Sequence, residues 1–331
     1  MTRFLFKTEK SDSIAKNDFI TYNEWSSWEK GDVMKKTIHP LILILVIGTV
    51  LAGGHPAASS EEIEKSFILQ EMTWTDVEDY LKTSDMVIIP IGATEQHGPH
   101  LPLGTDYYEA TGICRLISVR TGVVVAPVVM SGYSAYHSGF PGSLSLKPET
   151  MEEVLFETAE MLIQYGFKRF MFFNFHGGNR IVESKIIHRI NHSTEAIAVS
   201  IGVGSSLQKD VKLGVNAFDS HAGIGETSIM LFLEPDLVKL ERAEKPKMSY
   251  SSMTQQLFLL GQKNPALYDI LSGIQAVPVE TKKGGASHEI SDNGIWCAGD
   301  PKEATKETGE KMVMEMVNNA ARFIKDWKKI K

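Results

Sequence analysis

Two short apolar runs constrain the fold of this chain more than any other feature. Met86 to Gly92 reads MVIIPIG and Val123 to Val129 reads VVVAPVV, and both are rich in β-branched residues and nearly free of polar ones. Runs of this kind are typical of strands that are buried on both faces of a sheet. The segment between them, 107–120, carries apolar residues at helical spacing, so a strand–helix–strand unit is expected.

The same alternation continues along the chain, with a helix that ends at Gly166, a strand over 169–174, a helix over 180–191, a strand over 197–203 and a long amphipathic helix over 302–328. Thr150 and Glu153 have the spacing of a capping box, which predicts that the first of these helices begins there. Repeated strand–helix–strand units predict an α/β fold with a mostly parallel central sheet flanked by helices. We expect one catalytic domain over 61–331.

The composition is that of an ordinary globular protein. Hydrophobic residues make up 43% of the 331 and charged residues 23%, so an ordered core is expected. The formal net charge of −7 gives no reason to expect a nucleic acid or an anionic membrane surface as a partner. Cys114 and Cys297 lack CxxC spacing, and we expect buried small hydrophobic residues or surface bystanders rather than metal ligands.

The N-terminal segment differs from the rest of the chain. Residues 1–33 are polar without a sustained apolar period, and we expect a non-native extension or a disordered segment there. Residues 34–58 combine a basic start at Met34, an apolar run over 40–52 and a stretch of small residues, which is the pattern of a secretory signal peptide. Because the run is shorter than the roughly 20 residues of a membrane span, we expect translation to start at Met34, export to the periplasm or the extracellular space, and no stable membrane span after processing. A single anchoring helix over 40–52 is the alternative.

Three polar clusters follow expected strand ends or lie in nearby loops, where α/β sheets place their ligand sites. They read TEQHG with an aspartate farther on, FNFHGGN and DSHAGIGETS, and their candidate residues are Glu95, His97, Asp106, His176, Asp219, His221 and Glu226. The third cluster precedes a helix that is expected to begin near Thr227. Glu95 and His97 are two residues apart, so their side chains converge in an extended chain. Each cluster alone also has a plainer interpretation: a hydrogen-bonded pair in a loop, a helix cap or a surface pair.

The residue types in these clusters suit a metal centre. Mixed histidine and carboxylate ligands fit zinc, manganese or iron(II), whereas a sulfur-rich structural site needs cysteines that these motifs lack. A carboxylate such as Asp106 can bridge two ions about 3.5–4 Å apart. The sequence therefore predicts one or two divalent ions per subunit.

The motifs TEQHGPHLPLGTD, NFHGGN and DSHAGIGETS together resemble the signature of the creatininase family, the creatinine amidohydrolases and their relatives, across 73–233. This resemblance implies a metal-dependent amidohydrolase with an α/β/α layered fold that forms a homo-oligomer, often a hexamer. The implied metal ligands are Glu95, His97, Asp106 as the bridge, His176 and Glu226. The implied catalytic residues are His221, as an acid/base over the substrate, and Glu226.

The segment YSAYHSGFPGSLSL, 133–146, also fits the family. With the glycine-rich second motif, it implies a substrate-binding set made of Ser134, His137, Gly177, Gly178 and Asn179. Either a second metal ion or the backbone N–H groups of the last three are expected to stabilise a tetrahedral oxyanion. For the segment that contains His137, a structural loop with an exposed histidine is the alternative.

One position departs from the pattern of creatininase itself, in which the residue two places after the histidine that matches His176 is a glutamate ligand. Here that residue is Gly178, as in relatives that act on formamides, on cyclic sugar-like substrates or in trimming a peptide-derived cofactor precursor. We therefore expect Glu226 to supply the missing carboxylate. The expected substrate is a small-molecule amide other than creatinine, with a non-peptide C–N bond of the cyclic-amide or formamide type, cleaved by a metal-activated water. A metal-dependent phosphohydrolase and an exported metal- or solute-binding protein without catalysis are the alternatives.

Overall fold

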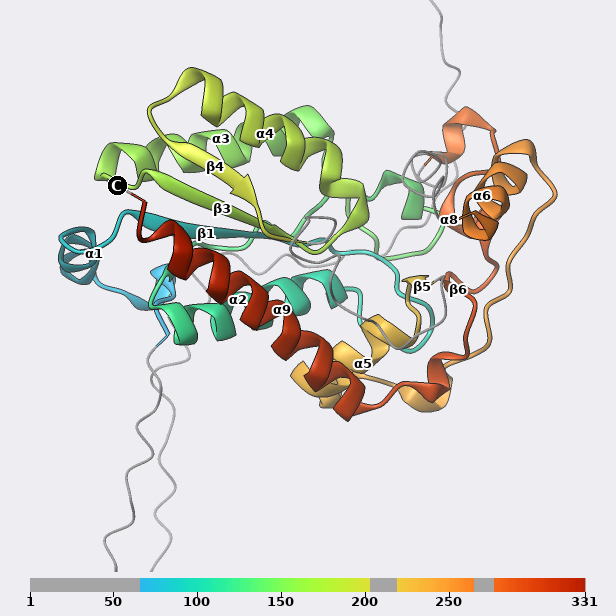
Figure 1. The fold of residues 1–331 in the computed structure, drawn as a ribbon. Coiled ribbons are helices and arrows are strands. Elements are labelled where there is room, and N and C mark those ends of the chain that lie inside the picture. The colour runs from blue at the N-terminus through green and yellow to red at the C-terminus, as the bar shows by residue number, and fades with distance from the viewer. Residues whose placement is uncertain (1–65, 203–218, 265–276, 331) are drawn as a thin grey trace, which may run out of the picture. The chain divides into compact units, whose positions relative to one another are not determined.

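The computed structural model describes residues 66–202, 219–264 and 277–330, which belong to one compact unit that spans 61–331 (Figure 1). The extension and the signal peptide predicted over 1–58 lie outside the described residues. Among the helices of the described ranges, none combines the length and the apolar character that crossing a membrane requires.

Four parallel strands form the central sheet in the spatial order β2–β1–β3–β4, which confirms the predicted fold class. They are β1 (Met86–Ile91), β2 (Val124–Val125), β3 (Arg169–Asn174) and β4 (Ile197–Ser200). All six residues of β1 are buried, and β1 pairs with β3 along its whole length. β2 is shorter than the run predicted over 123–129. Pairing resumes beyond it only as a single bridge between Ile91 and Val129.

Helices cover both faces of this sheet (Figure 1). The layer on one face contains α2 (Thr105–Thr121), α5 (Ile224–Leu233) and α9 (Lys306–Trp327), and the layer on the other contains α3 (Pro148–Tyr165) and α4 (Arg180–Ser193). Successive side chains of a strand point to opposite faces, so Ile88 packs with the first layer and Ile89 with the second. The result is the expected α/β/α arrangement. Further helices are α1 (Trp74–Leu81), α6 (Met253–Lys263) and α8 (Ser287–Ile290).

The start of α3 differs from its prediction. The helix begins at Pro148, and Lys147 caps it without a side-chain hydrogen bond, so the predicted capping box of Thr150 and Glu153 is wrong. Proline is well suited to the first helical position, because its φ is already helical and its missing N–H has no partner there anyway. The end of the helix is as predicted, since Gly166 adopts a φ of 113° at the C-cap.

Two other helices begin earlier than their sequence patterns predict. α2 begins at Thr105, and α5 begins at Ile224. Asp106 and Glu226 therefore lie in first helical turns rather than in loops. A helix holds both carboxylates on a rigid backbone, which a glycine-rich loop does not.

A second sheet, which the sequence did not predict, pairs β5 (Asp219–His221) antiparallel with β6 (Trp296–Cys297). Strands this short carry no readable alternation of polar and apolar residues. The pairing places Trp296 opposite His221, although the two residues are far apart in the sequence. Cys114 and Cys297 are both free and buried, as expected for small hydrophobic residues.

Candidate metal centre

The candidate ligands gather where the sheet changes its winding direction. β1 and β3 are neighbours, and their ends pair at Ile91 and Asn174. The chain leaves β1 toward α2 on one face and leaves β3 toward α4 on the other, and such a switch point opens a crevice beyond the strand ends. Glu95 and His97 follow β1, and His176 follows β3. All three are buried close together beyond these strand ends.

A glycine at the end of β1 lets Asp106 join them. A Cβ atom at Gly92 would lie 2.9 Å from the Tyr107 Cα and 3.0 Å from the Asp106 carbonyl oxygen. The first turn of α2 therefore packs directly against the strand end. Asp106 is only 1% exposed as a consequence.

The turn between β5 and α5 positions Glu226 and His221. Ala222 has a φ of 51°, an uncommon conformation for a residue with a Cβ, and its N–H donates to Glu226 Oε2 at 2.5 Å. Asp219 accepts a hydrogen bond from the N–H of Gly225 at 2.6 Å, so it stabilises the first turn of α5 rather than joining the ligands. Strained backbone of this kind persists where the surrounding structure holds it, often at functional sites.

The two oxygens of Asp106 face different histidines. Asp106 Oδ1 lies 3.3 Å from His97 Nε2, and Asp106 Oδ2 lies 3.2 Å from His176 Nδ1. On one side Glu95 Oε2 lies 3.2 Å from His176 Nε2, and on the other Glu226 Oε2 lies 3.8 Å from His97 Nε2. Two sets of three thus have ligand atoms within 4.8 Å of one another: Glu95 with Asp106 and His176, and His97 with Asp106 and Glu226. Asp106 is common to both.

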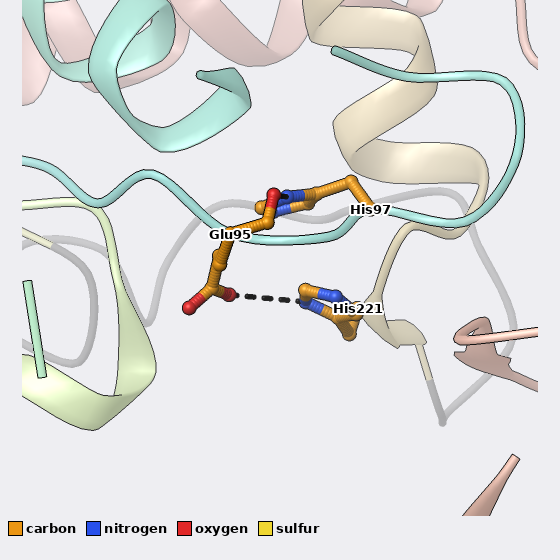
Figure 2. Close-up of side chains that lie close together, drawn as sticks. All are labelled: Glu95, His97 and His221. Carbon is orange, nitrogen blue, oxygen red and sulfur yellow. Dashed lines mark hydrogen bonds and ion pairs between the residues drawn. The ribbon is translucent and has the colours of Figure 1, made fainter. Parts of the chain in front are cut away.

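A third set contains Glu95, His97 and His221, and Figure 2 shows their side chains converging. The dashed line in that view joins Glu95 Oε1 to His221 Nδ1, which are 3.7 Å apart. The structure therefore brings together all five residues predicted as ligands and places the predicted acid/base beside them.

Several of these buried atoms lack a hydrogen bond of good geometry within the described part of the chain. They are both carboxylate oxygens of Glu95, His97 Nε2 and Asp106 Oδ2. Burying polar atoms without partners is costly, and native structures rarely do so without an ion or a water. The oxygen and imidazole donors fit a divalent cation.

The other ring nitrogens of the two histidines support this fit. His97 Nδ1 lies 3.2 Å from the Glu95 carbonyl oxygen, and His176 Nε2 lies 3.0 Å from the Tyr133 carbonyl oxygen. A carbonyl oxygen only accepts, so each ring donates there. When the rings are neutral, the lone pair of the other nitrogen faces Asp106, which is the arrangement typical of metal-binding histidines.

Charge balance in the cluster shifts the pKa values strongly. Burial lowers the pKa of His97, but the carboxylates of Asp106, Glu226 and Glu95 outweigh burial and raise it to about 9. Burial likewise opposes protonation of His176, and Glu95 and Asp106 raise its pKa well above the ordinary value. Burial raises the pKa of Glu95, but His137 and His176 hold it well below its usual range. Without a metal ion, protons on imidazoles thus compensate the carboxylate charge.

Two further groups beside the ligands also have shifted pKa values. Burial raises the pKa of Glu226 to about 7, although His97 lowers it. Burial, together with the neighbouring His97 and His137, holds the pKa of His221 well below its ordinary value, so His221 is neutral at pH 7. A neutral histidine can accept a proton during a reaction and then return it.

The predicted substrate-binding residues divide into two groups. His137 is 1% exposed and its Nε2 lies 3.1 Å from Glu95 Oε1, which excludes the alternative of an exposed loop histidine. Ser134 Oγ lies 3.4 Å from His176 Nε2, at the edge of hydrogen-bonding distance. Gly177 is exposed, with open space around its Cα.

Asn179 is engaged within the protein. The Asn179 side chain donates to the Gly92 carbonyl oxygen and accepts from the Tyr133 N–H, both at 2.9 Å. The Asn179 N–H donates to the His176 carbonyl oxygen at 3.1 Å, so this N–H group already has a partner within the protein. Binding of an oxyanion by the N–H groups of Gly177 and Gly178 stays a prediction.

The departure at Gly178 has a steric counterpart. A Cβ atom there would lie 2.3 Å from the Tyr133 carbonyl oxygen and 2.5 Å from His176 Nε2. A glutamate does not fit at this position unless the loop moves. Glu226 instead provides a carboxylate beside His97 and Asp106.

Three residues at the centre had no role predicted from the sequence. Tyr136 places its hydroxyl 3.3 Å from His176 Nε2. The ring of Trp296 lies 5.4 Å from that of His137 and 5.3 Å from that of His221. Gln96 lies within hydrogen-bonding distance of the same two histidines. Of these three residues, only Gln96 could have been suspected from the sequence, because it lies between two predicted ligands.

This chain combines an α/β/α sandwich with a histidine–carboxylate centre at a strand switch point. These two features are those of a candidate metallohydrolase. The profile of the creatininase family, described as creatinine amidohydrolase, matches residues 70–324, so this chain belongs to the creatininase family. The predicted resemblance is thereby confirmed.

The mycofactocin precursor peptide peptidase of Mycolicibacterium smegmatis is 33% identical to this chain over 251 residues, which cover 73% of this chain and 85% of that protein. The creatinine amidohydrolase of Pseudomonas putida is 31% identical over 199 residues, which cover 54% of this chain and 76% of that protein. A solved structure of creatinine amidohydrolase (creatininase) has a TM-score of 0.60 at 22% identity and covers 81% of this chain and 100% of that chain. This structural likeness supports the fold.

Proposed function

We propose that this protein is a metal-dependent amidohydrolase that cleaves the C–N bond of a small-molecule amide with a metal-activated water. Membership in the creatininase family supports a hydrolase that acts on C–N bonds. The observation that carries the metal dependence is the position of Asp106, whose two oxygens face His97 and His176 in two overlapping ligand sets. A shared carboxylate of this kind suits a pair of ions.

The proposed ligands are Glu95, His97, Asp106, His176 and Glu226, for one or two ions per subunit of zinc, manganese or iron(II). Divalent ions bound there supply Lewis acidity, which lowers the pKa of a coordinated water and polarises an amide carbonyl.

The protein's own residues then handle the proton. His221 is neutral, and its Nδ1 faces the ligand cluster beside Glu95. We assign it the role of taking a proton from the attacking water and returning it to the leaving nitrogen. General acid–base catalysis of this kind contributes typically 10²–10⁴-fold to the rate. Glu226 serves first as a ligand, because the Ala222 N–H holds its carboxylate toward His97.

The proposed substrate has a non-peptide C–N bond of the cyclic-amide or formamide type. Gly178, which stands where creatininase has a glutamate ligand, argues against creatinine itself. A peptide C–N bond is a second candidate, because a relative that covers most of this chain is described as a peptide peptidase.

The test is a hydrolysis screen of the zinc- or manganese-loaded protein over lactams, formamides, short peptides and phosphate esters. We expect turnover of one amide class and loss of turnover when a chelator removes the metal. His221→Ala is expected to keep its metal and lose about 10²-fold or more in kcat. His192→Ala, at an exposed histidine on α4, is the matched control and stays active. Turnover of phosphate esters alone, or metal binding with no amide hydrolysis, would replace this proposal with one of the alternatives.

We also propose that the protein is exported and forms a homo-oligomer. The signal-peptide pattern over 34–58 supports export, and family resemblance supports the oligomer, a hexamer above all. N-terminal sequencing of the natural product tests the first proposal, since a mature chain that retains Met1 contradicts it. Light scattering coupled to size exclusion tests the second, and a monomer contradicts it.

A further inference from the structure

Gln96, a buried residue at the centre, makes several close contacts that none of the roles assigned so far explains. It lies between Glu95 and His97 in the chain, and its side chain is 4% exposed. Its Nε2 lies 3.0 Å from His137 Nδ1, 3.0 Å from His221 Nε2, 2.9 Å from Ser287 Oγ and 3.1 Å from the Gly294 carbonyl oxygen. A buried amide with so many close partners constrains where their protons sit.

The orientation of the Gln96 amide follows from its neighbours. The N–H of Gly98 donates to Gln96 Oε1 at 2.9 Å, and a backbone N–H only donates. The carbonyl oxygen of Gly294, which only accepts, lies near the other end. The amide nitrogen therefore points at His137 and His221. A Cβ atom at Gly294 would lie 1.9 Å from Gln96 Oε1, so a glycine is required beside this amide.

The main chain of Gln96 decides the tautomer of His221. His221 Nε2 lies 2.7 Å from the Gln96 carbonyl oxygen, which only accepts, so the ring proton is on Nε2. A nitrogen that donates to this carbonyl has no lone pair for the Gln96 side chain. The lone pair of His221 is consequently on Nδ1, the nitrogen that faces Glu95 across 3.7 Å.

The side chain of Gln96 decides the tautomer of His137. With His221 Nε2 excluded as an acceptor, one amide hydrogen goes to His137 Nδ1 and the other to Gly294 or Ser287. His137 then carries its proton on Nε2, which lies 3.1 Å from Glu95 Oε1. This proton lies near a carboxylate oxygen, which is electrostatically favourable even without a hydrogen bond of good geometry.

We propose that Gln96 is a positioning residue that holds His137 and His221 in the Nε2–H tautomer, so that His221 presents a lone pair to the reacting atoms and His137 orients Glu95. The two histidines are set by different groups, His137 by the side-chain amide and His221 by the main-chain carbonyl. This inference rests on the proposed hydrolysis only for its kinetic test, because the tautomers themselves are independent of any substrate.

The test uses Gln96→Glu, which keeps the length of the side chain but faces His137 Nδ1 with an oxygen instead of an N–H. His137 must then place a proton on Nδ1. We expect kcat to fall roughly 10–100-fold, the range for residues that orient a metal's ligands, with KM and zinc content unchanged. Gln70→Glu makes the same chemical change at an exposed glutamine and is expected to have no effect.

Solid-state NMR of the zinc-loaded protein with ¹⁵N-labelled histidine reads the tautomers directly, and His137→Asn and His221→Asn assign the two rings. We expect both rings as Nε2–H in the native protein, and a proton on Nδ1 of His137 but not of His221 in Gln96→Glu. A native His137 or His221 with its proton on Nδ1 overturns the inference, even if the variant does not fold. Full kcat in Gln96→Glu, or loss of zinc with kcat, also overturns it. If the native protein hydrolyses no amide but shows these tautomers, the proposed function fails and the assignment of protons stands.

Discussion

Replacement of Asp106 by asparagine removes one negative charge from the cluster with little change in side-chain shape. Asp106 is the residue that the two ligand sets share, with one oxygen toward His97 and the other toward His176. Asp106→Asn therefore weakens both sets at once, whereas substitution of an unshared ligand weakens only one of them.

The size of the effect follows from Coulomb's law. At an effective dielectric constant of about 20, opposite unit charges about 4 Å apart attract by roughly 4 kcal/mol. Since about 1.4 kcal/mol is a factor of ten in affinity, losing one such pair predicts a metal affinity about 10³-fold weaker. A doubly charged ion makes this a lower bound.

The assay is metal content by mass spectrometry after dialysis, followed by titration of the metal-free protein. Glu109→Gln is the matched control, three residues farther along α2 and equally buried. Burial, with Glu226, Asp106 and Asp219 nearby, raises the pKa of Glu109 well above its usual value, which disfavours the charged form, so replacing this side chain removes less negative charge than replacing Asp106. Native affinity in Asp106→Asn, or an equal loss in both variants, would refute the reasoning.

Gly92→Ala adds a Cβ 2.9 Å from the Tyr107 Cα, so we expect the free energy of unfolding to fall by about 1–3 kcal/mol together with metal content; unchanged values in a denaturant titration would contradict the close approach. Gly178→Glu introduces the glutamate of creatininase at a position where a Cβ meets the Tyr133 carbonyl oxygen. We expect a lower Tm and no creatinine hydrolysis, and creatinine turnover would show that the loop adapts. Burial lowers the pKa of His97, but the neighbouring carboxylates raise it to about 9 in the metal-free protein. The proton on His97 must leave when an ion binds. Apparent metal affinity should therefore rise at least tenfold per pH unit between roughly pH 7 and 9, and more steeply where His176, whose pKa is also raised, must lose a proton too. A chelator-competition titration that shows no pH dependence would count against the assignment. Because this pKa lies above the ordinary 6.5, the stability that protonated His97 gives the metal-free protein is fully present below pH 6.5 and is lost as pH rises through about 9.

Local sequence patterns were sufficient where local interactions decide the structure. The strand predicted over 169–174 has those bounds, and β1 lies within the predicted 86–92. Both are short, largely apolar runs, which are typical of a strand buried on two faces. The predicted starts of α2, α3 and α5 were wrong because a helix begins where its first turn packs and is capped, and apolar spacing carries little information about either.

The sequence by itself determined that this chain forms a parallel α/β sheet and that glutamate, aspartate and histidine follow its strand ends. Only the tertiary structure decided that the two oxygens of Asp106 face different histidines, that Trp296 arrives from the other end of the chain, and that Gln96 sets two tautomers. The physical reason is the range of the interactions. Periodicity and motifs reflect neighbours in the chain, whereas the distances among these side chains exist only after long-range packing has ordered the strands and placed β6 beside β5.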